Sequence, residues 1–137
     1  MGHALEKIHR LLKPGSVLVD IHPTPEATEI EVRVGAQMHT AGWLHETDDY
    51  SDYAAADEAL AKVVKSGLFA VEREGTLSFA TYADTLAELR DYLTEGWENA
   101  RIDEITLARI EELTSTPERD KDIILRERVR IARLRPI

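Results

Sequence analysis

The 137-residue sequence contains no cysteine, which excludes disulfides, thiolate metal sites and a cysteine nucleophile. It lacks any run near the ~18 apolar residues of a membrane span, and its start lacks the apolar core of a signal peptide. Its seven glycines form no G-x-G pattern, so it holds no nucleotide-binding loop of that type. From these absences we expect a cytoplasmic protein that contacts no membrane and carries no cofactor.

Length and composition predict a single globular domain over residues 1–137. Hydrophobic residues make up 43% and charged residues 31%, and no repeat is evident. The net charge of −9 is unevenly spread, because residues 117–137 hold seven basic and four acidic side chains while the rest is strongly acidic. Such a chain is not expected to bind nucleic acid, although the basic tail offers a face to an acidic protein.

The apolar patterning predicts an α+β fold with a mixed, mainly antiparallel sheet of about six strands and about four helices packed on it. Gly35-Ala36 is expected to close a β-hairpin, and Gly42 to mark a bulge. Helices are expected over residues 4–12, from Ser51 or Asp52 to Gly67, after an Asp84 cap and after an Asp103 cap. Strands are expected over 17–21, 28–34, 37–45, 68–72, 76–82 and 123–131, the last with Ile123, Leu125, Val129 and Ile131 on its apolar face.

The first of these strands is the most informative. Its apolar run, Val17–Ile21, predicts a strand that is covered on both faces and stops at Pro23. Asp20 and His22 have the same parity along the strand, so both side chains are expected on one face near its carboxyl end. Open α/β sheets usually place their ligands at that end.

This stretch resembles a known family. A helix ending in Leu-Lys-Pro-Gly (residues 12–15), then an apolar strand closing on Asp-Ile-His-Pro (20–23), is similar to the segment around the fifth strand of class I S-adenosylmethionine-dependent methyltransferases. The match covers about residues 4–25, and Ser16 replaces the second glycine of the usual Leu-x-Pro-Gly-Gly run. In that family a glycine-rich turn and an acidic residue that hold the cofactor precede this segment. The resemblance therefore implies the carboxyl-terminal part of such an enzyme, without its cofactor-binding half.

Three residues are candidates for ligand binding. Asp20 and His22 have the chemistry of an acid–base pair, and the resemblance implies that they would line the substrate side of a pocket. The alternative is that Asp20 caps a turn and His22 is a loop residue. Trp43 is a candidate aromatic wall, although most aromatics at such spacings belong to the core. No pair of histidines has the spacing of metal ligands, so no metal site is expected.

Arg126, Arg128 and Arg130 are candidates for binding a partner, because they alternate along one face of the last strand. The alternative is a solvated face whose charges are paired within the chain. No aromatic residue alternates with these arginines, which argues against single-stranded nucleic acid.

Two functions remain open. The first is a non-catalytic methyltransferase-like module that associates with a second copy of itself, or with a partner chain that carries the cofactor half. The second is a small-molecule-binding domain or enzyme with a pocket near Asp20 and His22. We expect the chain to have no catalytic activity alone, and any methyltransferase-related activity to need a partner chain.

Overall fold

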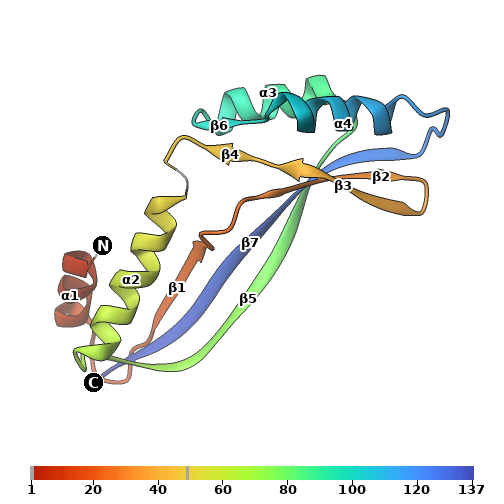
Figure 1. Cartoon of the computed structure of the whole chain (residues 1–137). Coiled ribbons are helices and arrows are strands. Elements are labelled where there is room, and N and C mark those ends of the chain that lie inside the picture. Colours follow the sequence, from red (N-terminus) through yellow and green to blue (C-terminus); the bar gives the residue numbers. More distant parts are fainter. Residues whose placement is uncertain (1, 49) are drawn as a thin grey trace. The chain divides into compact units, whose positions relative to one another are not determined.

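The computed structural model describes residues 2–48 and 50–137, which form four helices and seven strands (Figure 1). The helices are α1 (Gly2–Leu11), α2 (Ser51–Lys65), α3 (Leu86–Gly96) and α4 (Glu104–Thr114). The strands are β1 (Leu18–Pro23), β2 (Glu29–Val34), β3 (Gln37–Trp43), β4 (His45–Glu46), β5 (Phe69–Ala83), β6 (Ala100–Arg101) and β7 (Lys121–Pro136). The predicted α+β fold is confirmed. None of these helices combines the length and apolarity needed to cross a bilayer.

The chain divides into two compact units, each with a hydrophobic core of its own. Unit 1 comprises Met1–Pro25, Ser51–Leu77 and Arg128–Ile137. Unit 2 comprises Glu26–Tyr50 and Ser78–Glu127. Strands β5 and β7 belong to both units, because one part of each strand lies in unit 1 and the other part lies in unit 2. The sequence-based expectation of one domain over 1–137 stays a prediction.

In unit 1, helices α1 and α2 pack together and α2 contacts β1. Strand β1 pairs antiparallel with β7, and β5 also pairs with β7. The core of this unit consists of Leu5, Leu60, Val63, Phe69, Ala132 and Leu134. Leu60 and Val63 are three residues apart on α2, so one face of the helix supplies both.

Strand β1 is not covered on both faces, so that prediction is wrong. Its odd positions Val19 and Ile21 are 53% and 61% exposed, and Val17, just before the strand, is 39% exposed, whereas His22 is buried. Among the strands of the described residues β1 pairs with β7 alone, which leaves its second edge without a strand partner. An apolar run shows that a strand can be buried, but not how many neighbours cover it.

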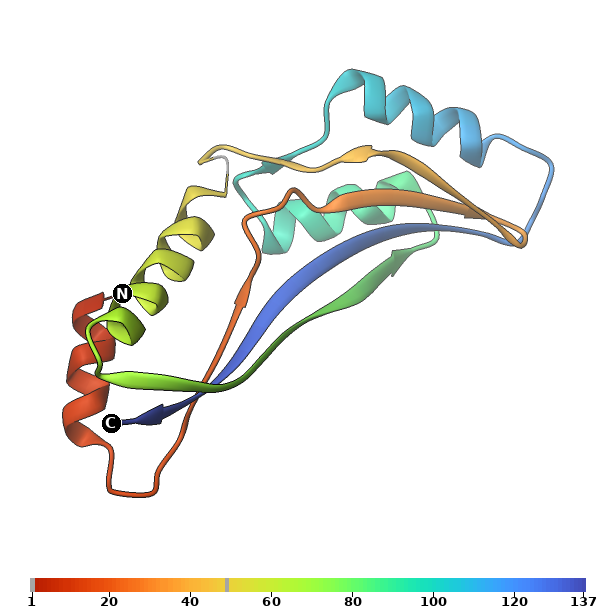
Figure 2. The same ribbon diagram turned by 60° about the horizontal axis from the view of Figure 1, so that its bottom comes forward.

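The two strands expected over 68–72 and 76–82 are a single strand, β5. Gly75 does not have the positive φ that a tight reversal at Arg73–Gly75 would use. Because β7 is a continuous strand of 16 residues, it offers β5 a long partner along which to stay extended. Figure 2 shows β5 in green beside β7 in blue.

Unit 2 contains the predicted hairpin of β2 and β3, with Gly35 at φ 59° in the turn. Strand β2 also pairs antiparallel with β7. The pairing shifts between Ile30, opposite Gly42, and Glu31, opposite Thr40, so a bulge lies next to Gly42. Helix α4 contacts both strands of the hairpin. The buried core comprises Ile30, Val32, Leu44, Ala83, Leu89, Leu93, Ile110, Leu113, Ile123 and Leu125.

Two local predictions need correction. Helix α3 is capped by Thr85 rather than Asp84: its side chain accepts from the Glu88 N–H at 3.1 Å. On β7 the predicted apolar face is buried at Ile123 and Leu125, but further along the buried positions are Ala132 and Leu134 instead of Val129 and Ile131. The two parts of this strand contribute to different cores, which alternation along the sequence does not reveal.

Candidate functional site

Asp20 and His22 lie on one face of β1, as expected, and the structure brings them into contact. His22 Nδ1 lies 2.6 Å from Asp20 Oδ2. The other ring nitrogen, Nε2, lies 2.9 Å from Oδ1 of Asp57 on α2. The histidine is only 9% exposed. A buried imidazole is therefore held between two carboxylates.

Arg130 extends this arrangement. It lies directly opposite His22 in the pairing of β1 with β7, which places both side chains on one face of the sheet. Its guanidinium donates to Asp57 Oδ1 at 2.8 Å and to Glu74 Oε2 at 2.6 Å. We call the resulting set of Asp20, His22, Asp57, Arg130 and Glu74 the ionic chain. It joins α2, β1, β5 and β7 within unit 1.

The central carboxylate is held in its charged form. Burial raises the pKa of the Asp57 carboxyl, but hydrogen bonds from His22 and Arg130 outweigh that effect and lower the pKa below its ordinary value. Sequence analysis missed Asp57 because nothing local to α2 marks it as the partner of a histidine 35 positions away. The feature that could have pointed to Asp57 is its place directly after Ala56, which lies on the buried face of α2.

The ionic chain limits what His22 can do chemically. Carboxylate oxygens only accept, so the imidazole donates to both aspartates when it carries two protons, and to one of them when neutral. In either state each ring nitrogen of His22 faces an aspartate of the ionic chain, Asp20 or Asp57. The arrangement fastens α2 to the sheet and presents no ring nitrogen to a substrate.

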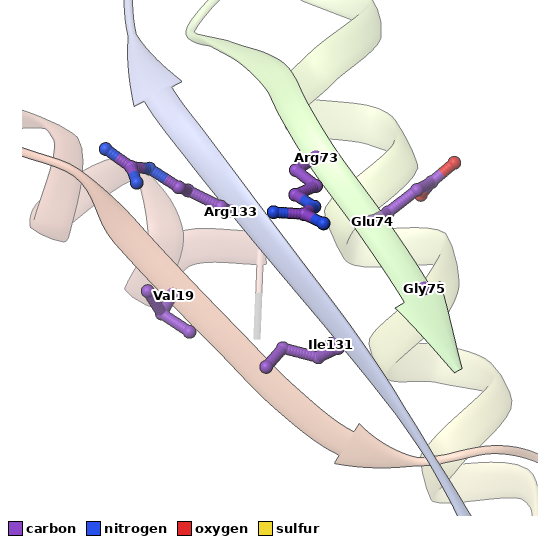
Figure 3. Close-up of a pocket in the computed structure, with 6 residues that line it drawn as sticks. All are labelled: Val19, Arg73, Glu74, Gly75, Ile131 and Arg133. Atoms are coloured by element: carbon purple, nitrogen blue, oxygen red, sulfur yellow. The ribbon is translucent and has the colours of Figure 1, made fainter. Parts of the chain in front are cut away.

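A hollow of about 490 Å³ lies in unit 1, lined by Val19, Arg73, Glu74, Gly75, Ile131 and Arg133 (Figure 3). Val19 and Arg133 face each other across β1 and β7, at positions that alternate with those of Asp20 and His22. The hollow and the histidine therefore lie on opposite faces of this pair of strands. The predicted ligand residues Asp20 and His22 do not line it.

The hollow combines an apolar floor with two arginines. Figure 3 shows the side chains of Arg73 and Arg133 over the strands, beside Val19 and Ile131. Arg133 Nε is 3.0 Å from a carboxylate oxygen of Glu72. No carboxylate partner for Arg73 is found among the residues that the structure describes.

The third predicted ligand residue, Trp43, is the last residue of β3 in unit 2, and its side chain is 52% exposed. It is not part of the hollow in unit 1. The other tryptophan, Trp97, packs against the core of unit 2 and donates to Glu46 Oε1 at 2.8 Å. Trp97 thus occupies the core position that its helical spacing indicates.

Two of the arginines predicted to bind a partner, Arg126 and Arg130, form ion pairs with carboxylates of this chain. Arg126 donates to both carboxylate oxygens of Glu31, at 3.0 and 3.1 Å, and Glu31 is only 9% exposed. Arg130 belongs to the ionic chain, and Arg128 is exposed on β7. These contacts fit the alternative in which the basic face is neutralised internally.

Unit 2 contains a polar cluster that sequence analysis missed. The Tyr50 hydroxyl donates to the Leu44 carbonyl at 2.8 Å and accepts from the Thr28 N–H at 3.3 Å. Burial raises the pKa of Tyr50. Burial is also the main cause that raises the pKa of Glu127, and the charge of Glu46 raises it further.

No group of three or more metal-ligating side chains occurs within residues 2–48 and 50–137.

Comparison with known proteins adds no family to this geometry. No protein-family model, curated protein or solved structure matches the chain. The resemblance to class I methyltransferases therefore depends on about residues 4–25 of the sequence.

Proposed function

We propose that this chain is a non-catalytic, methyltransferase-like module that acts by associating with another protein chain at β1. The observation that carries the proposal is the exposure of Val19 and Ile21 on a strand whose second edge has no strand partner in the described residues. Exposed apolar side chains on an open strand edge favour contact with another polypeptide.

The chemistry of β1 suggests how a partner binds. An unpaired strand edge offers backbone N–H and C=O groups to an added strand, and alternate side chains provide the specificity. Two exposed β-branched residues on one face, Val19 and Ile21, give that strand an apolar surface to cover. Pro23 ends β1, so the added strand pairs with no more than the six residues Leu18–Pro23.

The family resemblance suggests which partner. The segments that hold the cofactor in class I methyltransferases precede the segment that residues 4–25 resemble. A partner chain carrying that cofactor half would pair with β1 and cover its exposed face. The ionic chain supports a non-catalytic role for the present polypeptide, because both nitrogens of His22 already face carboxylates.

The test compares Ile21→Lys with Ile105→Lys, since both replace an exposed isoleucine, at 61% and 83% exposure, by the same charge. Immobilised wild-type chain and both variants are incubated with cell extract, and retained proteins are identified by mass spectrometry. We expect a protein with a glycine-rich cofactor loop to be retained by the wild type and by Ile105→Lys, but not by Ile21→Lys.

Calorimetric titration with S-adenosylmethionine completes this experiment. We expect heat of binding from the complex and none from the isolated chain. Cofactor binding by the chain alone, or equal retention by both variants, would overturn the proposal.

The hollow in unit 1 favours a second candidate function, binding of a small anion with an apolar part. Arg73 supplies a cation that has no carboxylate partner among residues 2–48 and 50–137, and Val19 and Ile131 supply apolar contacts. Thermal-shift measurements with a series of alkyl carboxylates would test it. Stabilisation that is lost in Arg73→Met supports this function, and the absence of any shift removes it.

A further inference from the structure

We propose that β5 pairs antiparallel with β5 of a second copy of this chain, forming a dimer whose two-fold axis passes through Gly75. This inference concerns a second copy of the chain. It uses a different strand from the association proposed above and does not depend on β1. A self-complementary pattern of side chains along β5 carries it.

Strand β5 has an open edge. It pairs with β7, and no other strand of the described part of the chain pairs with it. All nine residues from 71 to 79 are exposed, among them Val71 at 38%, Leu77 at 46% and Phe79 at 44%. The strand contains neither proline nor lysine, the residues that commonly protect such an edge.

Two-fold symmetry restricts how the strand can pair with itself. An axis perpendicular to the sheet keeps each side chain on its own face, so paired residues must have the same parity. With the axis at Gly75, Val71 lies opposite Phe79 of the second copy, and Arg73 lies opposite Leu77. An aromatic residue opposite a β-branched one is a favourable cross-strand pair. The aliphatic stem of Arg73 covers the leucine while its charge stays in water.

The other face is equally self-complementary. In the same register Glu72 lies opposite Ser78 of the second copy, and Glu74 lies opposite Thr76. Each carboxylate thus meets a hydroxyl, which can donate to it. No two like charges lie directly opposite each other.

The neighbouring registers are less complementary. An axis at Arg73 or Glu74 places that charged residue directly opposite its own copy, which is destabilising. An axis at Thr76 replaces the contact between Val71 and Phe79 by one between Val71 and Thr81. At Gly75 an added Cβ meets nothing within 4 Å, so a side chain introduced at this position does not clash with the rest of the chain.

The absence of cysteine from the chain makes a direct test possible. In Gly75→Cys the two introduced thiols lie opposite each other, about 4.5–5.5 Å apart between Cα atoms, which suits a disulfide. In the matched control Val71→Cys the two thiols are eight residues apart along the pairing, or about 26 Å. We expect mild oxidation to link Gly75→Cys into a dimer and to leave Val71→Cys monomeric on a non-reducing gel. No linkage, or equal linkage of both variants, would overturn the proposal.

A charge exchange tests the same register without cross-linking. Leu77→Lys places a lysine opposite Arg73 at both symmetry-related positions. We expect its dimer dissociation constant to rise at least about 10-fold in sedimentation velocity. Adding Arg73→Glu puts opposite charges across the axis and should restore dimerisation. Ile105→Lys, on α4, is the control and should dimerise like the wild type.

These outcomes are distinct from those of the β1 proposal. Ile21→Lys should leave the disulfide of Gly75→Cys unchanged while abolishing retention of the cofactor-bearing partner. Circular dichroism of each variant confirms that it is folded. The dimer would be overturned if the folded chain stays monomeric and its Leu77→Lys and Arg73→Glu variants behave like the wild type. That result would leave the proposed partner at β1 unaffected.

Discussion

His22 and Arg130 lie directly opposite each other on β1 and β7, and a single oxygen of Asp57 accepts from both. This cross-strand pair joins an imidazole and a guanidinium into one binding site for a carboxylate on α2. Helix α2 is thereby tied to two strands by ionic contacts as well as by its apolar face. In this fold the predicted Asp20–His22 pair takes part in the contacts that join α2 to the sheet.

Replacing Asp57 by alanine is expected to destabilise the chain by about 1 to 3 kcal/mol, because it removes the acceptor of one nitrogen of His22 and one of the two carboxylates that Arg130 contacts. Urea unfolding followed by circular dichroism measures the change. Glu58→Ala, at an exposed neighbouring position of α2, is the control and should stay within about 0.5 kcal/mol of wild type. Equal effects of the two substitutions would show that the ionic chain contributes nothing specific.

The lowered pKa of Asp57 predicts how stability changes in acid. A carboxyl whose pKa is lower in the folded state contributes its full stability above its unfolded pKa, near the ordinary value of 3.8. That contribution is lost as the pH falls through the folded pKa. We expect the urea midpoint of wild type to fall more steeply below pH 3.8 than that of Asp57→Asn. Parallel curves for the two proteins would contradict this assignment.

Glu127 is expected to have the opposite pH dependence. Burial and the charge of Glu46 raise its pKa, so its protonated form favours folding, and this contribution is lost as the pH rises through the folded pKa. Glu127→Gln should therefore be more stable than wild type at about pH 7, and the difference should shrink towards about pH 4. Unfolding curves at both pH values check this, and a difference that grows in acid would refute it.

Gly42→Ala is expected to destabilise unit 2 by about 1 to 3 kcal/mol through overpacking. An added Cβ at this bulge position would lie 2.2 Å from Thr106 Oγ1 and 2.7 Å from its Cγ2. Gly75→Ala is the matched control, since its added Cβ meets nothing within 4 Å. Thermal unfolding of both variants distinguishes the two sites, and a neutral Gly42→Ala would show that α4 moves away at no cost.

Local features of the sequence predicted local structure well. Helix α2 begins at Ser51, the predicted hairpin turns at Gly35, and Asp103 caps α4 by accepting from the Thr106 N–H at 2.7 Å. Each of these features depends on residues within a few positions of one another. The shared face of Asp20 and His22 belongs to the same class, because alternation along one strand determines it.

Contacts between distant segments decided the rest. The sequence by itself determined where α2 begins, where β1 ends at Pro23, and that Asp20 and His22 share a face, since hydrogen bonding and side-chain direction within one element follow from neighbouring residues. Only the tertiary structure decided that Asp57 is the second partner of His22, and that β1 has one exposed face. It also decided that β5 is a single strand, because its conformation depends on pairing with β7, which begins 38 positions after β5 ends.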